Sequence, residues 1–71
     1  MEYDQLAHRV RAFRKLKGYT QQELAEKLDL SVAVLGSLER GTRKADPKLL
    51  ERICATLGIS YEELTAEKKQ P

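Results

Sequence analysis

The stretch that decides the fold is YTQQELAEKLDLSVAVLGSLERG, residues 19–41. Thr20 followed three residues later by Glu23 is a capping-box signature, which marks the start of a helix. Apolar residues then recur at helical spacing until Asp29 interrupts the pattern. Ser31 can cap a second helix, which Gly41 ends. Two such short helices joined by a tight turn have the dimensions of a helix-turn-helix, whose second helix is offered to the major groove of DNA.

The flanking sequence predicts three more helices. One covers residues 4–17, with an apolar stripe and Gly18 after its end. Another begins after Asp46, with Pro47 at its first position, where a missing N–H costs nothing. A second capping box, formed by residues 60–63, opens a short fifth helix. Five short amphipathic helices without a strand pattern predict an all-α fold with one shared core.

Length and composition limit what this fold can contain. The 71 residues predict a single domain, 1–71, with its core at residues 4–65 and a polar tail at 66–71. One cysteine, Cys54, and one histidine, His8, give no disulfide and no zinc-binding set, so we expect no metal and no cofactor. Without a bilayer-length apolar run or a signal-peptide core, we expect a cytoplasmic protein with no membrane partner.

Charge is distributed unevenly along the chain. The formal net charge is only +2, which by itself is a weak indication of nucleic-acid binding. Basic residues nevertheless cluster on the first helix and again after the second motif helix. Basic patches beside the motif suit phosphate contacts, although such residues can also simply solvate helix faces.

The combination of these elements resembles one known family. A basic helix is followed by GYTQQELAEKL, by a capped helix ending LERG, and by a helix closing on LGIS and EEL. This order resembles the phage-repressor/Cro-type helix-turn-helix family, the XRE family, over residues 6–64. The resemblance implies a five-helix, lambda-repressor-like DNA-binding domain. It also implies binding to a double-stranded DNA operator, usually as a homodimer on a palindrome.

The resemblance places the base-reading positions at Val32, Ala33, Gly36 and Ser37. Family members commonly carry side chains there that hydrogen-bond to base edges, whereas this chain has two apolar residues, a glycine and one hydroxyl. We expect Val32 and Ala33 to contact thymine methyl groups and Gly36 to allow a close approach. Ser37 is then expected to make the one direct hydrogen bond, so specificity in each half-site should be modest.

The resemblance also implies a set of phosphate-binding residues, namely Gln21 at the start of the second helix and Arg40, Thr42, Arg43 and Lys44 in the loop after the third. Side chains of these types donate to phosphate oxygens and position a protein without reading sequence. A solvated basic loop has the same composition, so here the structural and functional interpretations coincide.

Three further positions have expected structural roles. Arg14 and Glu39 lie at the edges of apolar stripes, so each charge needs a partner where the stripes meet, and the family has a charged pair at these positions. We therefore expect a structural ion pair. Asp29 occupies the turn where the family commonly has glycine, and we expect a left-handed conformation with slight strain.

The remaining chemically distinctive residues are expected to be structural. Cys54 lies on the inner face of the fourth helix, which indicates a core thiol, and His8 is expected at the surface. Tyr3 and Tyr61, near the ends of the domain, suit either a dimer interface or ordinary edge packing.

Two functions follow from the sequence. The first is a sequence-specific DNA-binding transcriptional regulator, a repressor acting as a homodimer by blocking polymerase at an operator, with a regulatory protein partner as one route of control. The alternative is a protein–protein interaction module that retains the fold and presents its apolar third helix to another protein. Catalytic arrangements and phosphate-binding glycine loops are absent from the sequence, so we do not expect an enzyme.

Overall fold

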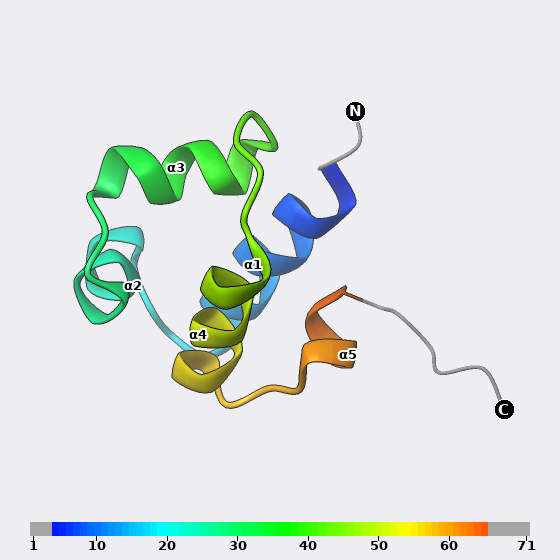
Figure 1. Cartoon of the computed structure of the whole chain (residues 1–71). Helices are drawn as coiled ribbons and strands as arrows, with labels where there is room; N and C mark the ends of the chain where they lie inside the picture. The colour runs from blue at the N-terminus through cyan, green and yellow to red at the C-terminus, as the bar shows by residue number, and fades with distance from the viewer. Residues whose placement is uncertain (1–3, 66–71) are drawn as a thin grey trace, which may run out of the picture.

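The computed structural model describes residues 4–65 and contains five helices, confirming the all-α prediction (Figure 1). The helices are α1 (Asp4–Leu16), α2 (Gln21–Leu28), α3 (Val32–Arg40), α4 (Pro47–Leu57) and α5 (Tyr61–Thr65). Turns and short loops join them, and no strand occurs within this range. The polar tail expected at residues 66–71 and the dimer-interface or edge-packing position expected for Tyr3 lie outside the described residues.

Local capping interactions decide where the helices begin and end. The side chains of Thr20, Ser31 and Asp46 each accept a hydrogen bond from the backbone N–H three residues ahead. The capping box at Thr20 is complete, because the Glu23 carboxylate also accepts from the Thr20 N–H. The bond from the Thr20 N–H, and after it the Thr20 side chain, holds the pKa of Glu23 below its ordinary value, because each favours the charged carboxylate.

The core lies where the apolar stripes of all five helices meet. Its completely enclosed side chains are Leu24, Leu28, Leu35, Ile53 and Leu64. The helix α1 packs against α3, α4 and α5, and α2 packs against α3 and α4. Because no helix of 5 to 13 residues is stable alone, this shared burial holds every element in place.

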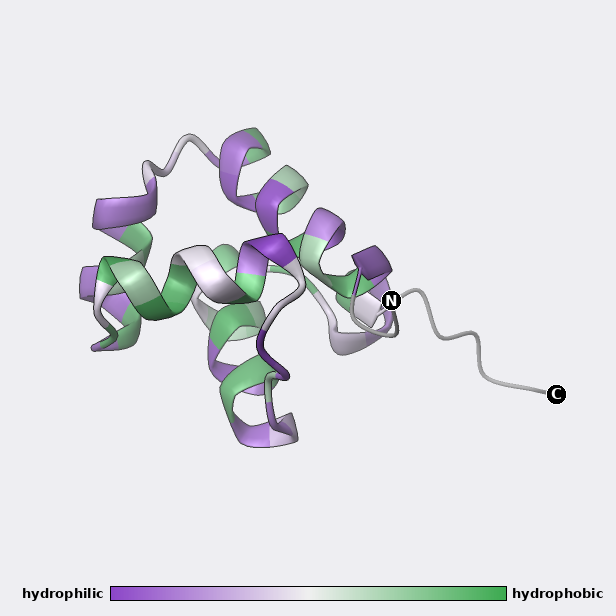
Figure 2. Cartoon of the chain, turned by 90° about the horizontal axis from the view of Figure 1, so that it is seen from above, coloured by the Kyte–Doolittle hydropathy of each residue, from purple (hydrophilic) through white to green (hydrophobic). Residues whose placement is uncertain are grey.

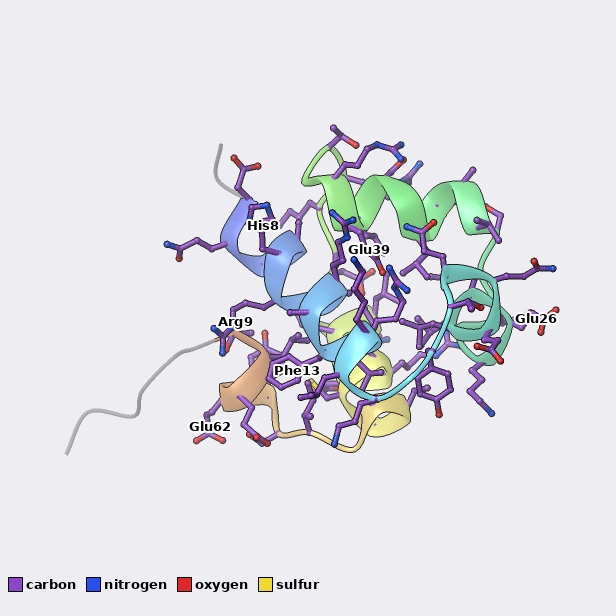
Figure 3. The ribbon with its side chains drawn as sticks, turned by 180° about the vertical axis from the view of Figure 1, so that it is seen from behind. His8, Arg9, Phe13, Glu26, Glu39 and Glu62 are labelled. Atoms are coloured by element: carbon purple, nitrogen blue, oxygen red, sulfur yellow. The ribbon has the colours of Figure 1, made fainter. Side chains whose placement is uncertain are left out.

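Two arginines join helices that are distant in sequence. The Arg9 side chain donates to the carbonyl oxygens of Glu63 and Leu64, more than 50 residues away, and lies 5.8 Å from the centre of the Phe13 ring (Figure 3). Arg52 on α4 donates to the Leu28 carbonyl at the end of α2. With α1, α2, α4 and α5 fixed around the core, α3 lies at the edge of the molecule and leaves its outer face uncovered (Figure 1).

Candidate nucleic-acid interface

The turn between α2 and α3 sets the direction of α3. Asp29 adopts φ 59° and ψ 40°, the left-handed conformation expected for it, and its N–H donates to the Glu26 carbonyl oxygen at 3.1 Å. Leu30 N–H donates to the Ala25 carbonyl at 2.8 Å. These two bonds close the C-terminus of α2 and let the chain turn into α3 within three residues. They therefore fix the angle at which α3 projects from the core.

A buried charge cluster fixes α3 from its other end. Arg14 Nε donates to Glu39 Oε2 at 2.7 Å, and a second guanidinium nitrogen donates to Glu39 Oε1 at 3.1 Å. The same guanidinium donates to the Tyr19 carbonyl oxygen at 2.9 Å. Arg14 is 7% exposed and Glu39 is 4% exposed. The contact expected between these residues is thus present, and Figure 3 shows Glu39 on the side of α3 that faces α1.

Gln21 joins this cluster to the start of α2. Its side-chain amide donates to Glu39 Oε1 at 3.0 Å, so Glu39 accepts from both helices α1 and α2. The capping box uses the N–H groups of Thr20 and Glu23. The N–H groups of Gln21 and Gln22 remain at the positive end of the helix dipole, where an anion is favoured.

An open depression of about 540 Å³ lies beside this helix start. Its lining residues are Arg11, Arg14, Tyr19, Thr20, Gln21, Glu39 and Arg40. Arg11 is exposed and was not among the expected phosphate ligands. Its position three residues before Arg14 on α1 could have indicated it, because residues at that spacing share one side of a helix. Arg11, Gln21 and Arg40 give the depression a cationic, donor-rich wall.

The outer face of α3 differs from the expectation in two respects. Val32 and Ala33 are exposed, with Val32 at 43%, so both can contact another molecule. Gly36 is buried, because the Arg40 side chain covers it. The hydroxyl of Ser37 donates to the Ala33 carbonyl at 3.1 Å, so its one O–H is already used. In this conformation the Arg40 side chain lies over Gly36 and the Ser37 hydrogen is directed at a backbone carbonyl, and the base-reading roles expected for Gly36 and Ser37 stay predictions.

The loop after α3 also differs in part from the expectation. Arg40 belongs to α3 and not to the loop, because the helix continues until Gly41 takes the left-handed conformation at φ 79°. The N–H and hydroxyl of Thr42 both donate to the Ser37 carbonyl, at 3.1 and 3.2 Å. Thr42 therefore closes the helix end in this conformation, and its phosphate-binding role stays a prediction. Arg43 and Lys44 are exposed and keep the expected position.

Hydropathy separates the two parts of this surface. Figure 2 looks down on α3, which is mainly apolar or neutral along its length and becomes hydrophilic at its end and in the following loop. An apolar helix face beside a basic loop suits contact with base edges on one side and phosphates on the other. Within residues 4–65, no group of histidine, cysteine or carboxylate side chains could hold a metal ion, and no helix is long and apolar enough to cross a bilayer.

Comparison with known proteins identifies the family. The sequence model described as "Helix-turn-helix" matches residues 10–64. The chain belongs to this family, the XRE family of helix-turn-helix DNA-binding transcriptional regulators. Its matched segment contains α2, the turn, α3 and the residues that build the charge cluster.

The relatives of this XRE-family chain are named as regulators. It is 44% identical over 69 residues to YazB, an HTH-type transcriptional regulator of Bacillus subtilis, covering 97% of this chain and 100% of YazB. It is 36% identical over 67 residues to the regulator SinR of the same bacterium, covering 92% of this chain and 60% of SinR. It is 33% identical to the immunity repressor of Bacillus phage phi105, over 89% of this chain and 44% of that protein.

Solved structures of the family have the same fold. The clp gene regulator ClgR from Corynebacterium glutamicum superimposes with a TM-score of 0.88 and 35% identity, over 93% of this chain and 70% of ClgR. A second solved structure is that of SinR, the master regulator for biofilm formation, in complex with DNA. It superimposes with a TM-score of 0.78 and 34% identity. That match covers 84% of this chain and 97% of the SinR chain.

Proposed function

We propose that this DNA-binding regulator is a sequence-specific repressor that binds a double-stranded operator as a homodimer. The observation that carries the proposal is the depression in which Arg11, Gln21 and Arg40 meet. The depression extends from the start of α2 to the end of α3. A phosphate bound at the start of α2 would therefore lie next to the bases that α3 reads. Arg43 and Lys44 extend the cationic surface along the loop.

The names of the relatives support a DNA-binding repressor. SinR has been crystallised in complex with DNA, and the phage phi105 relative is named an immunity repressor. Repression would be steric, because a protein occupying an operator excludes polymerase from the same DNA. Its control would come from protein concentration, dimerisation or a regulatory protein partner.

Homodimerisation is proposed because one α3 offers little base readout. Two half-sites read by two copies multiply a modest preference, provided that the two α3 helices lie about 34–36 Å apart, one turn of DNA. The operator should therefore be a palindrome whose half-sites are separated by one helical turn. A dimer also doubles the phosphate contacts, which supply most of the sequence-independent affinity.

A protein–protein interaction module is the second candidate. The observation that favours it is the apolar part of the α3 outer face, with Val32 at 43% exposure beside exposed Ala33. Such a face can pack against a helix of another protein. The two functions differ in salt dependence, because phosphate contacts weaken steeply as salt rises and apolar contacts do not.

Selection of bound sequences from a random duplex pool at physiological salt tests the proposal. We expect enrichment of one palindrome, together with a protein mass in the complex that corresponds to two chains, measured by sedimentation. The variant Val32→Gln should bind a changed set of sequences, because its amide can bond adenine. The variant Glu62→Gln, at an exposed position of α5, should select the wild-type palindrome. If no sequence is enriched and a protein partner binds the α3 face instead, the second candidate is correct.

A further inference from the structure

The Arg40 side chain occupies the place where Gly36 has no side chain. A Cβ built on Gly36 would lie 3.1 Å from Arg40 Nη1 and 3.9 Å from Arg40 Cζ. Arg40 Nη2 lies 3.4 Å from Ser37 Oγ. The guanidinium is therefore folded back by one helical turn over the outer face of α3, in the direction that long helical side chains prefer. It covers Gly36, which is the reason that an outward-facing glycine is buried.

Arg40 brings to this face the donors that its other residues lack. Val32 and Ala33 are apolar, and the Ser37 hydroxyl already donates to a backbone carbonyl. A guanidinium has five N–H donors, of which one is directed at Ser37. Arginine bonding to O6 and N7 of guanine is the commonest specific contact in the major groove. Among the described residues of α3, Arg40 is therefore the side chain with the chemistry to read guanine.

Gly36 and Ser37 together favour this placement. Glycine leaves room for the guanidinium against the helix, and the neighbouring Ser37 Oγ accepts from it at 3.4 Å. Arg43 and Lys44 lie in the loop after α3 and are exposed, and the family resemblance places phosphate contacts in this loop. The loop thus supplies cations for phosphates without Arg40.

We propose that Arg40 is the main base-reading side chain of this protein and that it recognises one guanine in each half-site. Gly36 provides the space that its guanidinium occupies. The inference rests on the proposed sequence-specific function and names the residue that carries it. It reassigns Arg40 from the phosphate-binding set to the base-reading set. The competing role is a phosphate contact, since Arg40 also lines the depression beside Gln21.

The test measures binding of the selected palindrome and of duplexes in which each base pair is replaced in turn. We expect Arg40→Ala to lose about 10- to 100-fold of discrimination at one guanine per half-site and to keep the preferences at other positions. Arg40→Lys, which keeps the charge and loses the fork of donors, should lose most of the same discrimination. Gly36→Ala should lose part of it, because the new methyl group displaces the guanidinium.

Two comparisons separate base reading from phosphate binding. Replacing that guanine by 7-deazaguanine removes N7, so it should weaken wild-type binding and leave Arg40→Ala binding unchanged. The matched control is Arg43→Ala, which should weaken binding to every duplex by the same factor. Circular dichroism of the Arg40 and Arg43 variants should match the wild type, because both residues are exposed.

The results that overturn the inference differ from those that overturn the proposed function. If Arg40→Ala weakens all duplexes equally and keeps the wild-type preference, Arg40 binds phosphate and only this inference fails. If the wild-type protein prefers no sequence, the proposed function and this inference fail together.

Discussion

Arg14 and Glu39 form a buried charge pair in which each side chain compensates the other. Replacing Arg14 by alanine leaves the 4%-exposed Glu39 carboxylate with Gln21 as its remaining partner. We expect a loss of about 3 kcal/mol in the free energy of unfolding, measured by urea denaturation at neutral pH, and a similar loss for Glu39→Ala. The exposed neighbour Arg11→Ala should change stability by less than about 0.5 kcal/mol.

The double variant Arg14→Met with Glu39→Leu tests whether desolvation causes this loss. Removing both charges leaves no unpaired ion, so the double variant should lose much less than the sum of the two single alanine losses. A loss in the double variant as large as that sum would show that an unpaired buried charge is not the cause of the single losses.

Cys54 illustrates how burial suppresses a reactive group. The residue is 6% exposed, and its Sγ lies 3.6 Å from the Ser60 carbonyl oxygen. Burial, together with the charges of Glu51 and Glu63, raises the thiol pKa above its ordinary value of 9.0. We expect a thiol-reactive probe to label the native protein at least about 100-fold more slowly than the protein in urea, because the thiolate is the nucleophile.

An exposed cysteine on the same helix provides the control for this labelling. Cys54→Ala combined with Ala55→Cys places a thiol at an exposed neighbouring position, which should react rapidly in the native state. The raised pKa of Cys54 also determines whether its contribution to the free energy of unfolding rises or falls with pH. Because the unfolded thiol ionises first as the pH rises above about 9, its contribution to stability is present below that pH and is lost above it. Rapid native labelling of Cys54 would contradict its inward position.

At the scale of the elements, the turn between α2 and α3 contains the one described non-glycine residue with positive φ, Asp29. Glycine adopts φ 59° without the clash between Cβ and the carbonyl oxygen that an L-residue suffers. We expect Asp29→Gly to raise the free energy of unfolding by about 0.5–1 kcal/mol and Asp29→Ala to lower it. Thermal unfolding measured by circular dichroism would detect both changes, and a destabilising Asp29→Gly would mean that the aspartate side chain stabilises the turn.

The helices could be predicted from the sequence because their ends depend on local contacts. Thr20 with Glu23, and Ser60 with Glu63, form bonds across three residues, so the pattern is visible in the sequence itself. The bond from Arg9 to Leu64 joins residues 55 positions apart, and no sequence periodicity indicates it. Local chemistry therefore predicted the elements, whereas the links between them required the three-dimensional structure.

The candidate site could likewise be predicted only in part from the sequence. The Arg14–Glu39 contact follows from two charges on apolar stripes that had to meet. The position of Arg40 depends on a rotamer that folds back over Gly36, which spacing alone cannot specify. Arg40 was consequently expected in the loop, although a residue four positions after a glycine on the same helix face could have suggested the arrangement.

At the scale of the whole molecule, the cationic residues determine how binding responds to salt. The net charge of +2 is small, so long-range attraction to DNA is weak and direct phosphate contacts should dominate the salt effect. Each neutralised phosphate contributes a slope of about −0.9 in a plot of log affinity against log salt concentration. Contacts from Arg11, Arg43 and Lys44 in each chain of a dimer, six in all, would give a slope of about −5.

The variant Arg43→Ala turns this slope into a test of stoichiometry. In a homodimer the substitution removes one phosphate contact from each chain, so the slope should flatten by about two units, whereas a monomer would lose about one. Filter binding to the selected palindrome at several salt concentrations measures the change. Glu26→Gln, an exposed substitution on α2, controls for the loss of a charged side chain and should not flatten the slope. A change of one unit would refute dimeric binding while leaving the phosphate contact intact, and an unchanged slope would remove Arg43 from the interface.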